Sequence, residues 1–553
     1  MRSHPHRVED TDAIAGSYDD RVRRLPLAAL VGGLLLTTAC GDGIDEGANQ
    51  GRGTRGTIDG VVLHTVPPAA PTESATTAPA PTDDTGTDDT GTSRPDPIGD
   101  PFEWTEIGPG LEEGYLEVPL DHSDPSGDTI LLYAVRHLAA DPAHRIGTLL
   151  VNPGGPGYGG SGLAYGAADI YGADLVDRFD IVGWDPRGTG YSEPTVDCIA
   201  DYDRFFAVDS SPDTPEEHQQ LVDLGREFGA GCQEANGDLL PHLSTEDSAR
   251  DMDAIRRALG EDTISYFGFS YGSELGATWA TLFPHTVRAA VLDGAVDPTV
   301  PYLQQNLQQA AGVETALAAF LAECSGDDRC AFHNGGDAEG AFDDLDSQID
   351  TEPVPGPTPG RPDITPGVFT TAVAQAMYDE NYWPELARAL DGLQHGDGLG
   401  ILSLYDEYFG YFDGTWDNAL EAYFAIGCLD DPGSTGPEDL FSHELDFAAA
   451  APRVGRGWLA ELAFCSVWPV PPVEPVAITG EGAGQILVMG TTGDAITPLE
   501  STRHMASALE NGRLVIVDAT QHTGYGVNAC GDDTVDTYLL DPTAPLPPET
   551  FCR

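Results

Sequence analysis

Residues 263–283 read TISYFGFSYGSELGATWATLF, and this stretch decides the fold. An apolar run, 263–269, ends at Ser270, and a helix-forming sequence starts directly after it. Gly268 and Gly272 flank the serine in a G-x-S-x-G pattern, a turn so tight that Cβ atoms at the glycines would clash. The pattern alone is common, but a strand before it and a helix after it are the context that it requires. We therefore predict a strand–turn–helix unit that exposes the Ser270 hydroxyl as a nucleophile.

Further apolar runs of the same kind lie on both sides of this turn. Each is short and bounded by Gly, Pro or Asp, and they span 146–151, 179–185, 287–294, 485–490 and 513–518. Helix-like stretches separate them. This alternation is typical of a mostly parallel sheet with helices on both faces. Together with the serine turn it indicates the α/β-hydrolase fold.

A serine hydroxyl is a weak nucleophile until a histidine removes its proton, and a carboxylate must orient that histidine. In this fold the acid and then the histidine follow the serine, at the ends of later strands. Asp494 follows the run 485–490, and His522 follows the run 513–518. We predict a catalytic triad of Ser270, Asp494 and His522. Asp518 is a rival acid, although it lies on the same strand end as His522.

Two backbone N–H groups are expected to stabilise the oxyanion of the reaction. One is that of Tyr271, directly after the nucleophile, and our candidate for the other is Gly155 in the turn NPGGPG (152–157). A phosphate-binding loop is the alternative interpretation of this turn, but no Gly-Lys-Ser/Thr follows it. We expect no metal, because no CxxC or CxxC/HxxxH spacing occurs, and no cofactor.

Several motifs together resemble one family, the secreted tripeptidyl aminopeptidases of actinobacteria, which are relatives of proline iminopeptidases. The motifs are NPGGPG (152–157), GWDPRGTGYSEP (183–194), the stretch 244–276, GTTGDAITP (490–498) and QHTGYGVNAC (521–530). The resemblance covers about residues 103–553 and implies the same triad. It also implies an exopeptidase that releases short peptides from N-termini. An esterase or amidase of the same fold and a catalytically silent surface-binding protein are the alternatives.

The spacing between nucleophile and acid predicts an inserted domain. Ser270 and Asp494 are 224 positions apart, more than simple crossovers need, and 310–324, 369–393 and 418–428 read as amphipathic helices. We expect the hydrolase core at 101–298 and 428–553, with a helical cap at 299–427 between them. In the family that the motifs resemble, acidic side chains of the cap recognise the free amino end of the substrate. Glu380 and Asp379 are candidates for that role, with a solvated surface as the alternative.

The first hundred residues predict export. Three arginines (Arg21, Arg23 and Arg24) precede an apolar run, 25–36, that ends in Leu-Thr-Thr-Ala-Cys at 36–40. This arrangement is typical of a signal peptide, expected at 1–40, and its end is similar to a lipobox, which would place a lipid on Cys40. Ordinary secretion is the alternative. The run is too short to span a bilayer, so we expect membrane contact only through the lipid. Residues 41–100 read as a disordered Thr/Pro/Asp-rich tether.

The charge balance excludes one class of partner. The formal net charge is −65, and all 26 cationic side chains are arginine. A nucleic-acid partner is not expected, because a phosphate backbone needs a basic patch. A GC-rich genome and adaptation to saline surroundings both explain an acidic chain without lysine, and both stay open.

The cysteines fit an exported chain. Eight follow Cys40, and an even number in such a chain indicates disulfides. Neighbours along the chain suggest the pairs 198–232, 324–330, 428–465 and 530–552, although sequence alone does not determine connectivity.

Overall fold

The computed structural model describes residues 101–433 and 436–553, and its strands, helices, disulfides and contacts belong to these residues. The expected signal peptide (1–40) with Cys40 and the expected tether (41–100) lie outside them. None of the helices described is long and apolar enough to cross a membrane.

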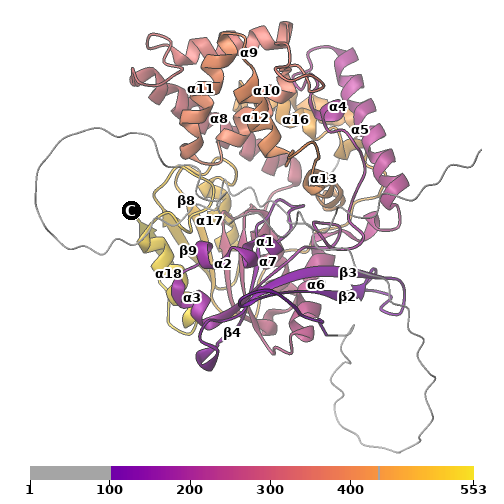
Figure 1. The fold of residues 1–553 in the computed structure, drawn as a ribbon, viewed down its shortest axis with the longest axis vertical. Helices are drawn as coiled ribbons and strands as arrows, with labels where there is room; N and C mark the ends of the chain where they lie inside the picture. Colours follow the sequence, from indigo (N-terminus) through magenta and orange to yellow (C-terminus); the bar gives the residue numbers. More distant parts are fainter. Residues whose placement is uncertain (1–100, 434–435) are drawn as a thin grey trace, which may run out of the picture. The chain divides into compact units, whose positions relative to one another are not determined.

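Ten strands form one sheet in the order β1-β2-β3-β5-β4-β6-β7-β8-β9-β10 (Figure 1). Its central strands are the apolar runs of the sequence, and they pair in parallel. Their residues are almost all buried, as expected of parallel strands covered on both faces. The predicted sheet is therefore confirmed. These strands are β4 (Gly147–Asn152), β5 (Phe179–Trp184), β6 (Ile264–Phe269), β7 (Val287–Asp293), β8 (Ile486–Thr491) and β9 (Gly512–Val517).

The two edges of the sheet differ from its centre. β1 (Thr105–Gly108), β2 (Leu111–Pro119) and β3 (Thr129–His137) form an antiparallel edge that joins β5, and β10 (Glu549–Cys552) pairs in parallel with β9. In β2 buried Leu116 and Val118 alternate with exposed residues, the pattern of a strand with one covered face. None of these four strands is among the apolar runs that predicted the sheet.

Helices cover both faces of the sheet. The side chains of the strands therefore pack into two apolar clusters, one on each face. Leu150 and Leu292 belong to one cluster, whereas their neighbours Leu149 and Val291 belong to the other, because successive strand residues point to opposite faces. The first cluster includes α6 (Thr245–Ala258), α7 (Tyr271–Leu282) and α17 (Leu499–Ala508). The second includes α1 (Ser161–Tyr165), α2 (Ala167–Ile170), α3 (Ala173–Arg178) and α18 (Ala529–Leu540). Short 3-10 turns lie at Pro142–His144, Leu240–His242 and Pro284–Thr286.

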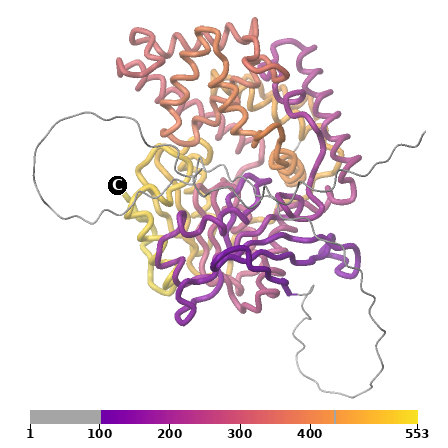
Figure 2. Tube along the Cα trace, viewed as in Figure 1, coloured from indigo at the N-terminus to yellow at the C-terminus, as the bar shows by residue number. Residues whose placement is uncertain are grey.

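The chain between β7 and β8 is helical and has an apolar cluster of its own, and we call this part the cap. Figure 2 follows this part of the chain away from the sheet and back to it. Its helices are α8 (Tyr302–Gly326), α9 (Ala338–Thr351), α10 (Pro366–Ala376), α11 (Trp383–Gln394), α12 (Leu399–Tyr408), α13 (Ala419–Leu429), α14 (Pro437–Leu440), α15 (Glu444–Ala450) and α16 (Gly455–Glu461), with 3-10 turns η4 (Glu380–Tyr382), η5 (Phe441–His443) and η6 (Cys465–Val467).

The cap differs from the expectation in three places. The helix expected at 369–393 is two helices, α10 and α11, separated by η4; Pro384 stands in the first turn of α11, where its missing N–H is tolerated. The expected cap end at 427 falls within α13, and helices continue to α16 before the sheet resumes at β8. Within 101–298, α4 (Asp203–Phe206) and α5 (Pro215–Asn236) also occur, and Leu221 of α5 packs in the cap cluster.

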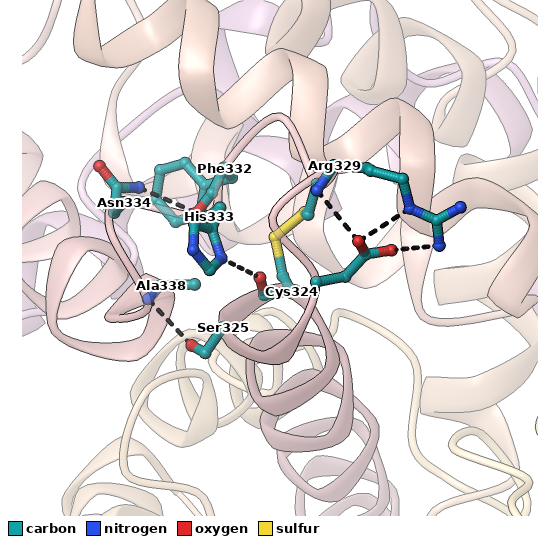
Figure 3. The surroundings of a disulfide bond; sticks show 9 residues. Cys324, Ser325, Arg329, Phe332, His333, Asn334 and Ala338 are labelled. Carbon is teal, nitrogen blue, oxygen red and sulfur yellow. Dashed lines mark hydrogen bonds and ion pairs between the residues drawn. A yellow bond between two sulfur atoms is a disulfide. The ribbon is translucent and has the colours of Figure 1, made fainter.

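Four disulfides join the cysteines as their order along the chain suggested: Cys198–Cys232, Cys324–Cys330, Cys428–Cys465 and Cys530–Cys552. Figure 3 shows the second, at the end of α8, where the carbonyl oxygen of Cys324 lies 2.9 Å from Nδ1 of His333. The pairing is confirmed, and disulfides of this number are typical of exported proteins.

Candidate active site

Ser270 stands in a sharp turn between β6 and α7. Its backbone has φ 54° and ψ −126°, outside the regions that a non-glycine residue normally occupies, and its N–H donates to the Asp293 carbonyl oxygen at 2.7 Å. A Cβ at Gly272 would lie 2.8 Å from Asn152 Oδ1, and one at Gly154 would lie 2.9 Å from the Ser270 Cβ. Glycine at these two positions therefore lets the neighbouring chain approach Ser270 more closely than a residue with a Cβ atom would allow.

His522 and Asp494 form a buried pair at the carboxyl ends of β9 and β8. Nδ1 of His522 lies 3.0 Å from both carboxylate oxygens of Asp494, and the two residues are 2% and 5% exposed. Asp494 also accepts hydrogen bonds from Ile496 N at 2.9 Å, Thr497 N at 2.8 Å and Thr497 Oγ1 at 3.0 Å. These bonds hold the carboxylate in place, and the carboxylate in turn orients the imidazole with Nε2 directed away from Asp494.

The end of β7 connects the loops of the serine and the histidine. The Asp293 carboxylate accepts from Gly524 N at 2.7 Å and Tyr525 N at 2.8 Å, while its carbonyl oxygen accepts from Ser270 N. Burial raises the pKa of Asp293 to about 6. The next residue, Gly294, has φ +66°, and a Cβ there would lie 2.9 Å from His522 Cε1. The glycine leaves the space that the imidazole needs.

Asp518, the rival candidate for the acid, lies apart from the imidazole. Its side chain is exposed, and its carboxylate accepts from the Thr492 hydroxyl at 3.1 Å. Of the two candidates, only Asp494 is in contact with His522.

Ser270 and His522 open onto a cavity of about 350 Å³ between the sheet and the cap. Both predicted oxyanion donors, Tyr271 and Gly155, line it. Tyr271 is the first residue of α7, and the first N–H groups of a helix have no partner within the helix. The Tyr271 hydroxyl lies 2.5 Å from Thr245 Oγ1.

The cap contacts the histidine loop directly. The Tyr378 carbonyl oxygen accepts from His522 N at 2.7 Å, and the Tyr378 ring stands edge-on to the imidazole with centroids 5.7 Å apart. Asp379 and Gln521 form an antiparallel bridge beside this contact. The position of the imidazole therefore depends on the cap as well as on the core.

The two acidic residues predicted for substrate binding do not line the cavity. Asp379 is buried, and its carboxylate accepts from the backbone and side-chain N–H groups of Asn381, both at 2.8 Å; Glu380 is exposed. The carboxyl groups that line the cavity are Glu274, Asp297, Glu407, Asp417 and Glu461. The sequence did not single them out, because acidic residues are abundant in this chain. One signal was present: Glu461 is the only charged residue in the apolar stretch GWLAELAFC (457–465).

Burial raises the pKa of Glu461 to about 7, and a hydrogen bond with Tyr423 acts in the opposite direction. No ion pair joins Glu461 to a cation within 101–433 and 436–553. Burial likewise raises the pKa of Glu274, one helical turn after Ser270, to about 7, with the charge of Asp430 adding to the effect. A cation bound beside either carboxylate would offset the free-energy cost of burying its charge. Both groups are therefore suited to bind a positively charged group of a ligand.

Comparisons with known proteins agree with this geometry. Residues 147–334 match the family described as "alpha/beta hydrolase fold", and residues 451–552 match the family described as "TAP-like protein". The chain is 34% identical over 474 residues to the serine protease Hip1 of Mycobacterium tuberculosis, covering 81% of this chain and 90% of that protein. It is 35% identical over 445 residues to carboxylesterase B of the same organism (78% and 84% covered).

The tripeptidyl aminopeptidase of Streptomyces lividans is 31% identical over 447 residues, covering 78% of this chain and 81% of that protein. The family that the sequence motifs resemble is thereby confirmed. The chain is a serine hydrolase and belongs to the α/β-hydrolase family that includes the serine protease Hip1 and the tripeptidyl aminopeptidases.

Proposed function

We propose that this protein is an exopeptidase that removes short peptides from the N-termini of peptide substrates through an acyl-enzyme. The observation that carries the proposal is the buried His522–Asp494 pair, whose histidine lines, together with Ser270, a cavity between the sheet and the cap. A cavity between a catalytic core and a cap suits a chain end better than the middle of a long polypeptide, because a chain end has to enter from one side only.

In the proposed reaction His522 takes the proton of Ser270 Oγ as the oxygen attacks the scissile carbonyl carbon. The N–H groups of Tyr271 and Gly155 stabilise the oxyanion of the tetrahedral intermediate. The C–N bond then breaks, and His522 gives its proton to the leaving amine. The shortened substrate leaves as this amine. Water then attacks the resulting ester while His522 accepts a proton from it. The bond between Ser270 Oγ and the acyl carbon breaks, His522 returns the proton to Oγ, and the removed N-terminal peptide leaves as its carboxylic acid. Asp494 keeps the imidazole in the required tautomer and stabilises its charged form.

We further propose that Glu461 pairs with the free ammonium group of the substrate. Glu461 is half-buried, lines the cavity from the cap, and lies close enough to Tyr302, Tyr408 and Tyr423 to affect the pKa of each of them. Tyrosine rings attract cations through their faces, so this part of the cavity combines a carboxylate with a favourable aromatic surface. An acetylated N-terminus would leave the carboxylate buried without a cation.

A matched set of arylamides tests the proposal: the same tripeptide with a free and with an acetylated N-terminus, and a nitrophenyl ester. We expect turnover of the free peptide, at least about 10-fold lower kcat/KM for the acetylated one, and no turnover by the Ser270→Ala variant. Glu461→Gln should remove the difference between free and acetylated substrates. Because one relative is named a carboxylesterase, preferred cleavage of the ester or of the blocked peptide would instead support an esterase or endopeptidase.

The disulfides indicate an exported protein, and we propose that it is attached to the membrane by a lipid on Cys40. The support is the arginine-rich start, the apolar run and the small residues before Cys40. Radiolabelled palmitate should be incorporated into the expressed chain and not into its Cys40→Ala variant. Release of an unlabelled protein into the medium would favour ordinary secretion.

A further inference from the structure

A second cavity of about 80 Å³ adjoins the first inside the cap region. The two cavities share a wall of six residues: Ala374, Tyr408, Phe409, Leu420, Trp458 and Glu461. We call the second cavity the side chamber. The same carboxyl group that we assign to the substrate ammonium, Glu461, therefore stands at the boundary between the catalytic cavity and the side chamber.

The walls of the side chamber are apolar and well packed. The ring of Phe206 stacks on Phe424 at 5.9 Å and on Phe464 at 5.4 Å between centroids, and all three line the chamber. Polar groups are few among its lining residues: the side chains of Ser210, Thr370, Thr371 and Glu461 and the polar ends of Tyr408 and Trp458. Stacked aromatic rings form a rigid surface that attracts apolar groups and offers no partner for a second charge.

We propose, on the basis of the proposed function, that the side chamber binds the side chain of the substrate's N-terminal residue and selects aliphatic or aromatic ones. The amino group and the side chain of that residue are bonded to the same Cα atom. A substrate whose ammonium group pairs with Glu461 must therefore place its first side chain close to Glu461. Of the two cavities that meet there, the catalytic one has to hold the rest of the peptide, which leaves the side chamber for the first side chain.

The size of the chamber agrees with this occupant. A cavity needs about 10–15 Å³ for one water-sized group, so about 80 Å³ accommodates roughly five to eight such groups. Leucine and phenylalanine side chains are of this size, whereas glycine leaves the chamber empty. A glutamate side chain would bring a second carboxylate beside Glu461, and like charges in a buried site repel strongly.

The test uses the full-length protein and tripeptide arylamides that differ only in the N-terminal residue: Gly, Leu, Phe and Glu. We expect kcat/KM for the Leu and Phe substrates to exceed that for Gly by about 10-fold or more, since a filled apolar pocket discriminates by such factors. The Glu substrate should be the poorest. The Leu-to-Gly ratio of kcat/KM is the quantity compared between variants.

Ala460 lines only the side chamber, so Ala460→Leu should narrow it and bring the Leu-to-Gly ratio close to 1. The matched control is Ala449→Leu, the same change at an exposed position of α15, which should keep the ratio of the unaltered protein. If Ala460→Leu does not fold, as judged by thermal melting, Thr371→Leu narrows the chamber from the half-buried surface of α10.

The outcomes separate this inference from the proposed function. A Leu-to-Gly ratio near 1 in the unaltered protein, with a free amine still required, would overturn the side-chamber assignment and leave the exopeptidase standing. A Leu-to-Gly ratio that the folded narrowing variant leaves unchanged would overturn it as well. If the unaltered protein shows no preference for substrates with a free amine, the proposed function is overturned, and with it the side-chamber assignment that rests on it.

Discussion

At the scale of single residues, we predict that Asp494 and not Asp518 is the acid of the triad. Asp494→Asn should lower kcat by about 10⁴-fold, because an amide beside Nδ1 favours the wrong tautomer of His522. Asp518→Asn should leave kcat within about 2-fold, since Asp518 is exposed and contacts Thr492. Steady-state kinetics on one peptide arylamide compares the two variants. The reverse ranking would show that the acid of the triad has been assigned to the wrong residue.

Gly294 allows a test of the space around the imidazole. In Gly294→Ala the new methyl group would stand 2.9 Å from His522 Cε1, so we expect kcat to fall at least about 10-fold as the ring is displaced. Gly260→Ala is the matched control, because Gly260 also has a positive φ (+73°) but nothing within 4 Å of its Cβ position. Both variants should lose about 1 kcal/mol of unfolding free energy to backbone strain. Equal kcat values in the two variants would mean that the methyl group is accommodated without moving His522.

At the scale of elements, the last disulfide attaches the edge of the sheet. Cys530 lies in the first turn of α18, and Cys552 ends β10, which pairs with β9, the strand that leads to His522. The bond closes a loop of sequence separation 22, which corresponds to about 3 kcal/mol of lost entropy in the unfolded chain. We expect the Cys530→Ser/Cys552→Ser double variant to melt at a clearly lower temperature and to lose activity before the core unfolds.

The control for that experiment is the cap disulfide Cys324–Cys330, with a sequence separation of only 6. Its double serine variant should lose less stability, because the loop it closes is shorter and lies far along the chain from the histidine loop. A larger loss of melting temperature from the cap pair would contradict the loop-length argument for this protein.

At the scale of the whole molecule, buried carboxyl groups predict the pH dependence of stability. Their unfolded pKa values are near 4, whereas the folded protein holds their protons to pH 6 or 7. Between these values the unfolded chain binds fewer protons, so the free energy of unfolding falls as pH rises. Burial raises the pKa to about 7 for Glu274, Glu421, Asp430 and Glu461 and to about 6 for Asp293 and Asp346.

The stabilisation that the protonated buried carboxyl groups contribute to the folded state is complete below about pH 4, and it is lost as the pH rises through 6 to 7. Carboxylates with lowered pKa values, such as Asp251 beside Arg187, act in the opposite direction below pH 4. We therefore expect the melting temperature to be highest near pH 5 and to fall towards pH 8. A melting temperature that rises over that interval would show that the buried carboxyl groups do not govern stability there.

The net charge of −65 makes a separate prediction about salt. Like charges crowd the folded surface, and molar salt reduces the screening length to about 3 Å. We expect the melting temperature at pH 7 to rise from dilute buffer to molar sodium chloride. A flat or falling melting temperature would mean that the acidity is not an adaptation to salt. A GC-rich genome would then remain as the explanation of an acidic chain without lysine.

The sequence by itself determined the central strands, the serine turn and the order of Ser270, Asp494 and His522. Each of these is a pattern within a short window of the chain: an apolar run, two glycines around a serine, or a polar residue after a strand. The edge strands β1 and β10 are only four residues long, so no apolar run predicted them. β3 contains the apolar run 130–135, which was not among the runs from which the sheet was predicted.

Only the tertiary structure decided which carboxyl groups face the cavity. Asp379 and Glu380 were candidates because acidic side chains of the cap bind the amino end of the substrate in the family that the motifs resemble, yet Asp379 caps η4 and Glu380 faces solvent. Glu461 became a candidate because distant segments cover it: α8, α12 and α13 contribute the tyrosines around it. The burial of an acid depends on the surfaces that pack over it, and residues more than a hundred positions apart in the sequence supply those surfaces.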